Sequence, residues 1–126
     1  MSLQTPLNRV RGLGSAKEGT DHFWRQRLTA IANIPLMLFL VWTVLTTFGA
    51  PYEQVRETLA SPFTAIAFVL LAVSGAVHMR LGMQTIIEDY VPAEGPKLVL
   101  LVLNTFFAIL IALTAIYAVL KLTLGG

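Results

Sequence analysis

The chain has 126 residues, of which 56% are hydrophobic and only 13% charged, and its mean hydropathy is +0.71. This composition is too apolar for a soluble domain of that size, because such domains rarely expose large contiguous apolar surfaces to water. A net charge of +2 argues against nucleic acid as a partner. The absence of cysteine excludes disulfides, thiolate zinc sites and iron–sulfur clusters bound by this chain.

Three apolar stretches are long enough to cross a bilayer, whose hydrocarbon core needs about 20 mostly apolar residues. They predict transmembrane helices over about residues 27–49, 62–88 and 97–121. Together they leave no room for a separate soluble domain, so residues 1–126 are expected to form a single membrane-anchor domain. The predicted fold class is therefore an all-α membrane protein with three transmembrane helices.

The N-terminal segment, residues 1–25, is polar and precedes the first span. Basic residues gather in it or just after it: Arg9, Arg11, Lys17, Arg25 and Arg27. Because short cytoplasmic flanks carry an excess of Lys and Arg, we expect the N-terminus in the cytoplasm and the C-terminus outside. A bacterial inner membrane is favoured over a mitochondrial one, because no Arg- and Ser-rich, acid-poor transit segment precedes the first span.

Polar residues inside the first and third spans predict contacts with other helices. Asn33 and Pro35 lie in the first span, and Pro35 removes a backbone donor that neighbours must compensate. Asn104 and Thr105 lie in the third span. In a medium without water such residues favour hydrogen bonds between helices, which is the role we expect here.

The second span carries residues of another kind along one helical face. At separations of three and four residues, the stripe consists of Gly75, His78, Gly82, Thr85 and Asp89. An ionisable group at membrane depth indicates a functional site by default. Glycines one turn before and after His78 predict a shallow flat surface against which a planar macrocycle fits, as an axial haem ligand requires. Alternatively, the glycines admit another helix and His78 makes one interhelical hydrogen bond.

Two motifs resemble a known family, the small membrane anchor subunits of succinate dehydrogenase (respiratory complex II). The first is the run over residues 78–91, in which His78 is followed by Gly82-Met83 and by Asp89-Tyr90 at the helix end. The second is Arg27-Leu-Thr29-Ala-Ile, which is similar to the Arg-x-Thr-Ala-Ile that opens the first helix of the family. Three spans, chain length and a cytoplasmic N-terminus agree with the family over nearly the whole chain.

This resemblance implies a haem site built by two proteins. His78 would be one of two axial ligands of a b-type haem, and a larger cytochrome b anchor subunit would supply the other, since His22 lies outside the hydrocarbon region. Arg27 would pair with a haem propionate, although the positive-inside rule alone accounts for an arginine there. His22 would share the propionate role more weakly, because the histidine of the family stands at a slightly different spacing.

The resemblance also implies a quinone site at the end of the second span. Tyr90 would donate its phenolic hydrogen to a carbonyl oxygen of ubiquinone, and Asp89 would order water or relay protons. An ordinary interfacial tyrosine beside a helix-end acid is the alternative. Arg80 lies nearly opposite His78 on the helix, so we expect it to reach the membrane edge or a soluble subunit.

The function implied is that of a membrane anchor of succinate:quinone oxidoreductase. FAD and iron–sulfur clusters would be bound by partners only, the flavoprotein subunit and the iron–sulfur subunit, so this chain has no residues catalytic for succinate oxidation. One alternative is the anchor of a quinol:fumarate reductase, which runs the reaction in reverse. Another is a cofactor-free structural subunit of a different membrane complex.

Overall fold

The computed structural model describes residues 5–12 and 17–125, and this part of the chain is all-helical. The helices are α1 (Pro6–Gly12), α2 (Lys17–Thr47), α3 (Tyr52–Ala60), α4 (Pro62–Tyr90) and α5 (Glu94–Thr123). Three segments are long and apolar enough to cross a membrane, namely Gly19–Thr47, Pro62–Tyr90 and Glu94–Thr123. The prediction of an all-α protein with three such helices is confirmed. Of the predicted N-terminal segment, residues 1–4 and 13–16 lie outside the described residues.

Three helical stretches were not predicted, and the first is the short helix α1 in the N-terminal segment. α2 begins at Lys17, well before the apolar run, and the residues that lead up to the run include good helix formers such as Arg25 and Gln26, which hydropathy does not register. α3 occupies most of the stretch expected to be the first loop. It is polar, and its Arg56 guanidinium lies 3.8 Å from the Glu53 carboxylate one turn away.

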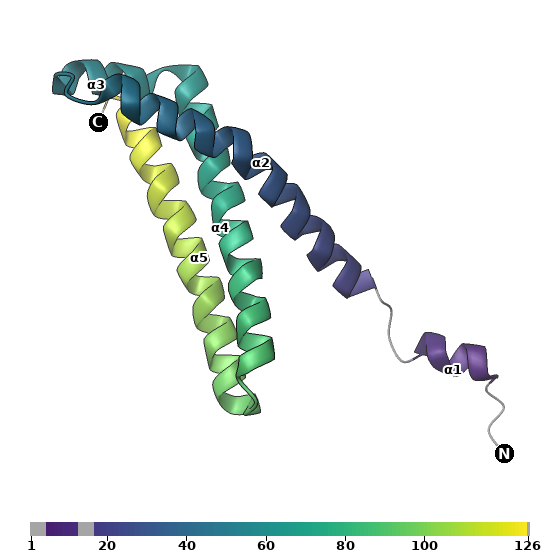
Figure 1. Ribbon diagram of the computed structural model, residues 1–126. Coiled ribbons are helices and arrows are strands. Elements are labelled where there is room, and N and C mark those ends of the chain that lie inside the picture. The colour runs from purple at the N-terminus through teal and green to yellow at the C-terminus, as the bar shows by residue number, and fades with distance from the viewer. Residues whose placement is uncertain (1–4, 13–16, 126) are drawn as a thin grey trace.

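The three long helices form an antiparallel pair and a crossing third helix (Figure 1). α4 and α5 run side by side and are joined by a short turn after Tyr90. α2 packs obliquely across α4, and its N-terminal half leads away from the lower part of α4. The C-terminal end of α2, α3 and the C-terminus therefore lie at one end of the molecule, and the turn between α4 and α5 lies at the other.

Small and polar residues hold α4 against α5. Ala76 and Ala108 are buried, which lets helix backbones approach closely in a membrane. The Asn104 side chain donates from Nδ2 to the backbone carbonyl of Arg80 at 2.9 Å. Arg80 in turn donates from Nε to the Thr105 hydroxyl at 3.1 Å. The interhelical role expected for Asn104 and Thr105 is confirmed. Arg80 was expected to reach the membrane edge or a soluble subunit, but its side chain bonds to α5.

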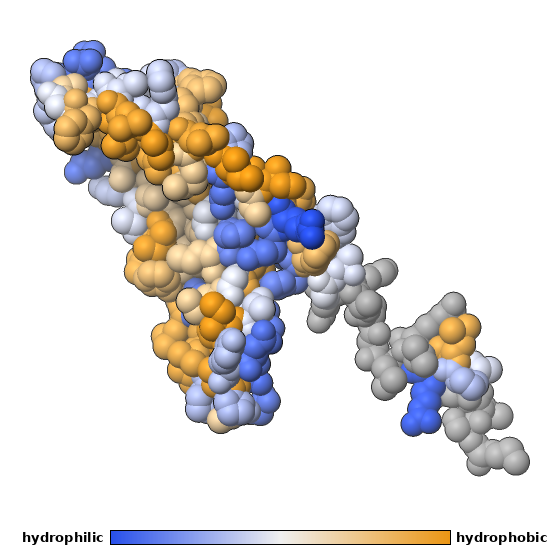
Figure 2. Space-filling model, in the orientation of Figure 1, coloured by the Kyte–Doolittle hydropathy of each residue, from blue (hydrophilic) through white to orange (hydrophobic). Residues whose placement is uncertain are grey.

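Very little apolar side-chain area is buried within the chain. Among the large apolar side chains that the structure describes, only Leu81 and Ile87 belong to the buried core. Large hydrophobic side chains stay exposed along all three spans, and orange covers much of the visible surface in Figure 2. In a bilayer such surfaces contact lipid acyl chains or other membrane subunits.

Candidate functional site

His78 lies in the interface between α2 and α4. Its side chain is half-buried, and its Nδ1 atom lies 3.1 Å from the hydroxyl oxygen of Thr29 on α2. One turn earlier on α4, the Ser74 hydroxyl donates to the backbone carbonyl of the same Thr29 at 3.4 Å. The two helices therefore meet at Thr29, and the imidazole is fixed from one side by this crossing.

A polar stripe on α2 faces this part of α4. Its members, at separations of four, three and four residues, are His22, Gln26, Thr29 and Asn33. Three buried polar atoms of the stripe have no hydrogen-bond partner among the described residues: Nε2 of His22, Oε1 of Gln26 and Oδ1 of Asn33. Because buried polar groups in native proteins are nearly always paired, these atoms indicate that another group completes the interface.

Figure 2 shows hydrophilic residues gathered where the N-terminal half of α2 leaves α4, between otherwise apolar helices. Sequence inspection assigned a site role to His22 alone among the four stripe members. The helical spacing of the stripe was the signal that would have grouped it with Gln26, Thr29 and Asn33.

The two glycines beside His78 have different surroundings. A Cβ atom added at Gly82 would lie 3.3 Å from the side-chain nitrogen of Gln26, so α2 covers this glycine. A Cβ added at Gly75 would meet nothing within 4 Å. The flat surface predicted around His78 is therefore open within the chain on the Gly75 side and covered by a flexible side chain on the Gly82 side.

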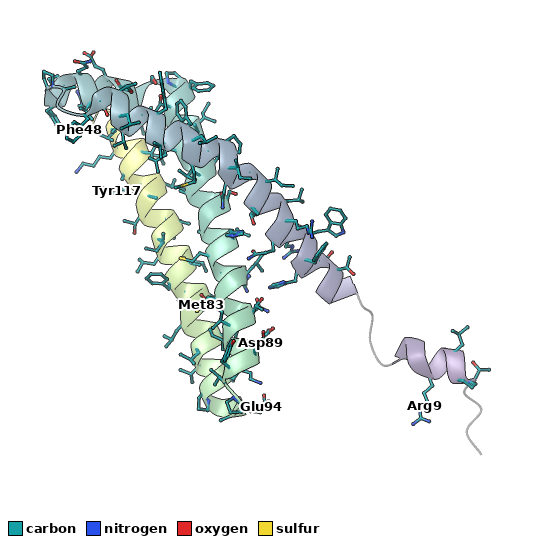
Figure 3. The ribbon with its side chains drawn as sticks, in the orientation of Figure 1. Arg9, Phe48, Met83, Asp89, Glu94 and Tyr117 are labelled. Atoms are coloured by element: carbon teal, nitrogen blue, oxygen red, sulfur yellow. The ribbon has the colours of Figure 1, made fainter. Side chains whose placement is uncertain are left out.

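Asp89 and Tyr90 lie at the far end of α4, and Figure 3 shows Asp89 beside the turn that leads to Glu94. Both are exposed, with 80% of Tyr90 accessible. At 1.5 Å per residue they lie about 16 to 18 Å along the helix from His78. The chain thus holds them on the same rigid helix as His78 and does not bring them into contact with it.

Arg27 does not join the polar stripe. Its guanidinium carbon lies 4.6 Å above the centre of the Phe23 ring, a cation–π contact within α2, and the side chain is exposed. Five residues separate Arg27 from His22, which places the two side chains roughly 140° apart around the helix. Only His22 shares the face that packs toward α4.

A separate groove of about 410 Å³ lies between α4 and α5. Its lining is almost wholly apolar and includes Met79, Met83, Leu103 and Phe107. None of the predicted site residues lines it. No group of three or more His, Cys, Asp or Glu able to hold a metal ion occurs in the described ranges.

Known proteins resemble this chain over most of its length. The sequence profile described as "Succinate dehydrogenase/Fumarate reductase transmembrane subunit" matches residues 1–115. The chain belongs to this family of membrane anchor subunits. The succinate dehydrogenase hydrophobic membrane anchor subunit of Paracoccus denitrificans is 31% identical over 122 residues, which cover 97% of this chain and 94% of that protein.

Two further succinate dehydrogenase anchor subunits are similar to this chain. The subunit of Rickettsia bellii (strain RML369-C) is 30% identical over 88% of this chain and 89% of its own length. The subunit of Reclinomonas americana is 30% identical over 74% of this chain and 80% of its own length. The chain is thus a multi-pass membrane subunit of a succinate dehydrogenase complex, and the alternative of a structural subunit in a different complex is wrong.

Proposed function

We propose that this anchor subunit binds one side of a b-type haem through His78 and forms part of a quinone-reduction site through Asp89 and Tyr90. The observation that carries the haem assignment is the hydrogen bonding of the two ring nitrogens of His78. Nδ1 is bonded to Thr29, whereas Nε2 has no hydrogen-bond partner among the described residues. A histidine that ligates iron uses one nitrogen for the metal and hydrogen-bonds through the other, so the residues present fit a haem ligand.

The second axial ligand would come from another subunit. His22, the other histidine of the chain, precedes Thr29 on α2 by seven residues, or about 10 Å along the axis. It therefore stands at a different depth from His78. A larger cytochrome b anchor subunit, packed against the exposed apolar faces of the three helices, would complete a helical bundle with the haem between the two proteins.

The unpartnered Nε2 of His22 supports a propionate contact on the same side. An imidazole N–H can donate to a carboxylate, and His22 shares its helix face with Thr29. Arg27 has the charge for this role, yet its side chain lies against Phe23 on another face of α2. His22 is accordingly the better placed of the two, and Arg27 would reach the propionate only by leaving the Phe23 ring.

The exposed end of α4 supports the quinone assignment. Tyr90 presents a neutral phenolic donor at the level where the membrane meets water, and it would orient a ubiquinone carbonyl by donating one hydrogen bond. Asp89, its neighbour, would pass protons from water toward the reduced oxygen. Because both side chains are exposed in this chain, the walls of the site would come from the partner subunits.

Succinate oxidation and electron delivery would be carried out by the partner subunits. A flavoprotein subunit containing FAD would oxidise succinate, and an iron–sulfur subunit would deliver the electrons to quinone beside this anchor. We further propose a bacterial inner membrane, with the N-terminus and the Asp89–Tyr90 end on the cytoplasmic side. Arg9 and Arg25 near the first span support this orientation. In this arrangement the chain tethers the soluble subunits and performs no dehydrogenase chemistry itself.

The test of the haem assignment is His78→Ala in the intact complex. We expect loss or alteration of the low-spin b-type absorption spectrum, because alanine cannot bind iron, while succinate oxidation with an artificial dye persists. Thr85→Val is the matched control, since Thr85 lies on the same helix face and its hydroxyl bonds only to the Leu81 carbonyl. A complex that assembles with His78→Ala and keeps the wild-type spectrum would move the ligand to another residue.

A further inference from the structure

The hydroxyl of Thr29 has only one proton, and the helix already uses it. Oγ1 of Thr29 lies 2.8 Å from the backbone carbonyl oxygen of Arg25 and 3.1 Å from that of Gln26, so its single hydrogen is donated to one of these carbonyls within α2. A threonine hydroxyl has one donor hydrogen and two acceptor lone pairs. Toward His78, 3.1 Å away, the same oxygen is therefore left to act as an acceptor.

An acceptor at this position selects one form of the imidazole. Nδ1 of His78 must carry the hydrogen that it donates to Thr29, which leaves the lone pair of the neutral ring on Nε2. We propose that Thr29 is a positioning residue that fixes both the tautomer and the ring orientation of His78, so that Nε2 is presented as the metal-binding atom. This inference rests on the proposed role of His78 as a haem ligand.

The surrounding contacts make Thr29 a rigid support. Ser74 bonds to the backbone carbonyl of Thr29, so both the side chain and the main chain of this residue are tied to α4. One turn toward the N-terminus, Gln26 packs on Gly82, where no larger side chain intervenes. The acceptor cannot move away from His78 without separating α2 from α4 at this level.

The hydrogen bond would also tune the redox behaviour of a bound iron. A donor bond from Nδ1–H to an oxygen makes the imidazole a more basic ligand, which favours the ferric form. The Thr29 oxygen is a stronger acceptor because its own hydrogen is donated to a backbone carbonyl at the same time. Loss of this bond should therefore weaken binding of the ferric form most and raise the midpoint potential.

The test compares three variants of the purified complex by haem content, redox titration and low-spin electron paramagnetic resonance. Thr29→Val keeps the shape and removes the acceptor. Loss of an outer-shell partner typically costs about 10- to 100-fold in metal affinity. A tenfold loss confined to the ferric form corresponds to a rise of about 59 mV for a one-electron couple. Thr29→Ser restores the hydroxyl and should return the potential to the wild-type value.

Thr46→Val is the matched control on the same helix. The Thr46 hydroxyl makes the same pair of backbone contacts, to the carbonyls of Trp42 at 2.9 Å and Thr43 at 3.1 Å, and makes no hydrogen bond to another helix among the described residues. We expect wild-type haem content and potential for it. A general loosening of α2 would instead lower haem content in Thr29→Ser and Thr46→Val as well, and that result would overturn the positioning role.

His78→Ala in the same series separates the two assignments. If His78→Ala abolishes the low-spin signal and Thr29→Val leaves potential and haem content unchanged, the role of Thr29 is refuted and His78 remains the ligand. If His78→Ala keeps the wild-type signal, the ligand assignment fails and the Thr29 inference fails with it.

Discussion

Replacement of Gly75 tests whether a planar group lies against the His78 face of α4. Gly75 is one turn from His78, about 4.5 Å along the axis, and a Cβ there would meet nothing within 4 Å in this chain. Within the chain, Gly75→Ala should therefore be neutral or stabilising, by up to about 1 kcal/mol from helix propensity. Any loss of stability in Gly75→Ala must therefore come from a clash with a group outside the chain.

The larger change, Gly75→Leu, should displace a macrocycle seated on this face. Forcing extra methylenes into a packed contact costs about 1 to 3 kcal/mol, which corresponds to roughly 5- to 150-fold weaker haem retention. The assay is haem per assembled complex during dilution into detergent with a haem scavenger. Gly95→Leu is the control, because a Cβ at Gly95 also meets nothing within 4 Å and lies far from His78 on α5. Full haem retention in Gly75→Leu would refute this placement.

Two other substitutions test the quinone site and the contact between α4 and α5. Tyr90→Phe should lower quinone-coupled turnover severalfold and leave dye-coupled succinate oxidation intact, because only the phenolic donor is removed; equal loss of both activities would indicate misassembly. Asn104→Leu should lower the stability of the α4–α5 pair by about 0.6 to 1.7 kcal/mol, the range for interhelical hydrogen bonds in membranes. A fall in the detergent-denaturation midpoint would show this, and an unchanged or higher midpoint would contradict it.

The sequence predicted those features that depend on local composition. The three spans follow from apolar length alone, and Asn104 could be assigned to a helix contact because a membrane offers it no water. The stripe through Gly75 and His78 follows from helical periodicity once α4 is known to be continuous. α3 was missed because its helix is polar and short, so hydropathy does not distinguish it from a loop.

The partners of each residue could not be predicted, because they depend on how the helices cross. Thr29 appeared in the sequence only as part of a motif, and its contact with His78 exists because α2 crosses α4 at that level. The sequence favoured Arg27 over His22 as a propionate ligand because the histidine of the family stands at a slightly different spacing. The structure shows that Arg27 packs on Phe23 while His22 belongs to the polar stripe, a distinction that requires the orientation of α2.

In the function proposed above, this chain contributes half of a haem site shared with a second anchor subunit. The most direct measurement is the dithionite-reduced minus oxidised spectrum of the purified wild-type complex, with haem counted against copies of this chain. We expect one low-spin b-type haem per chain in the complex and none bound by the chain alone. A fully assembled, quinone-reducing complex without haem would contradict the claim.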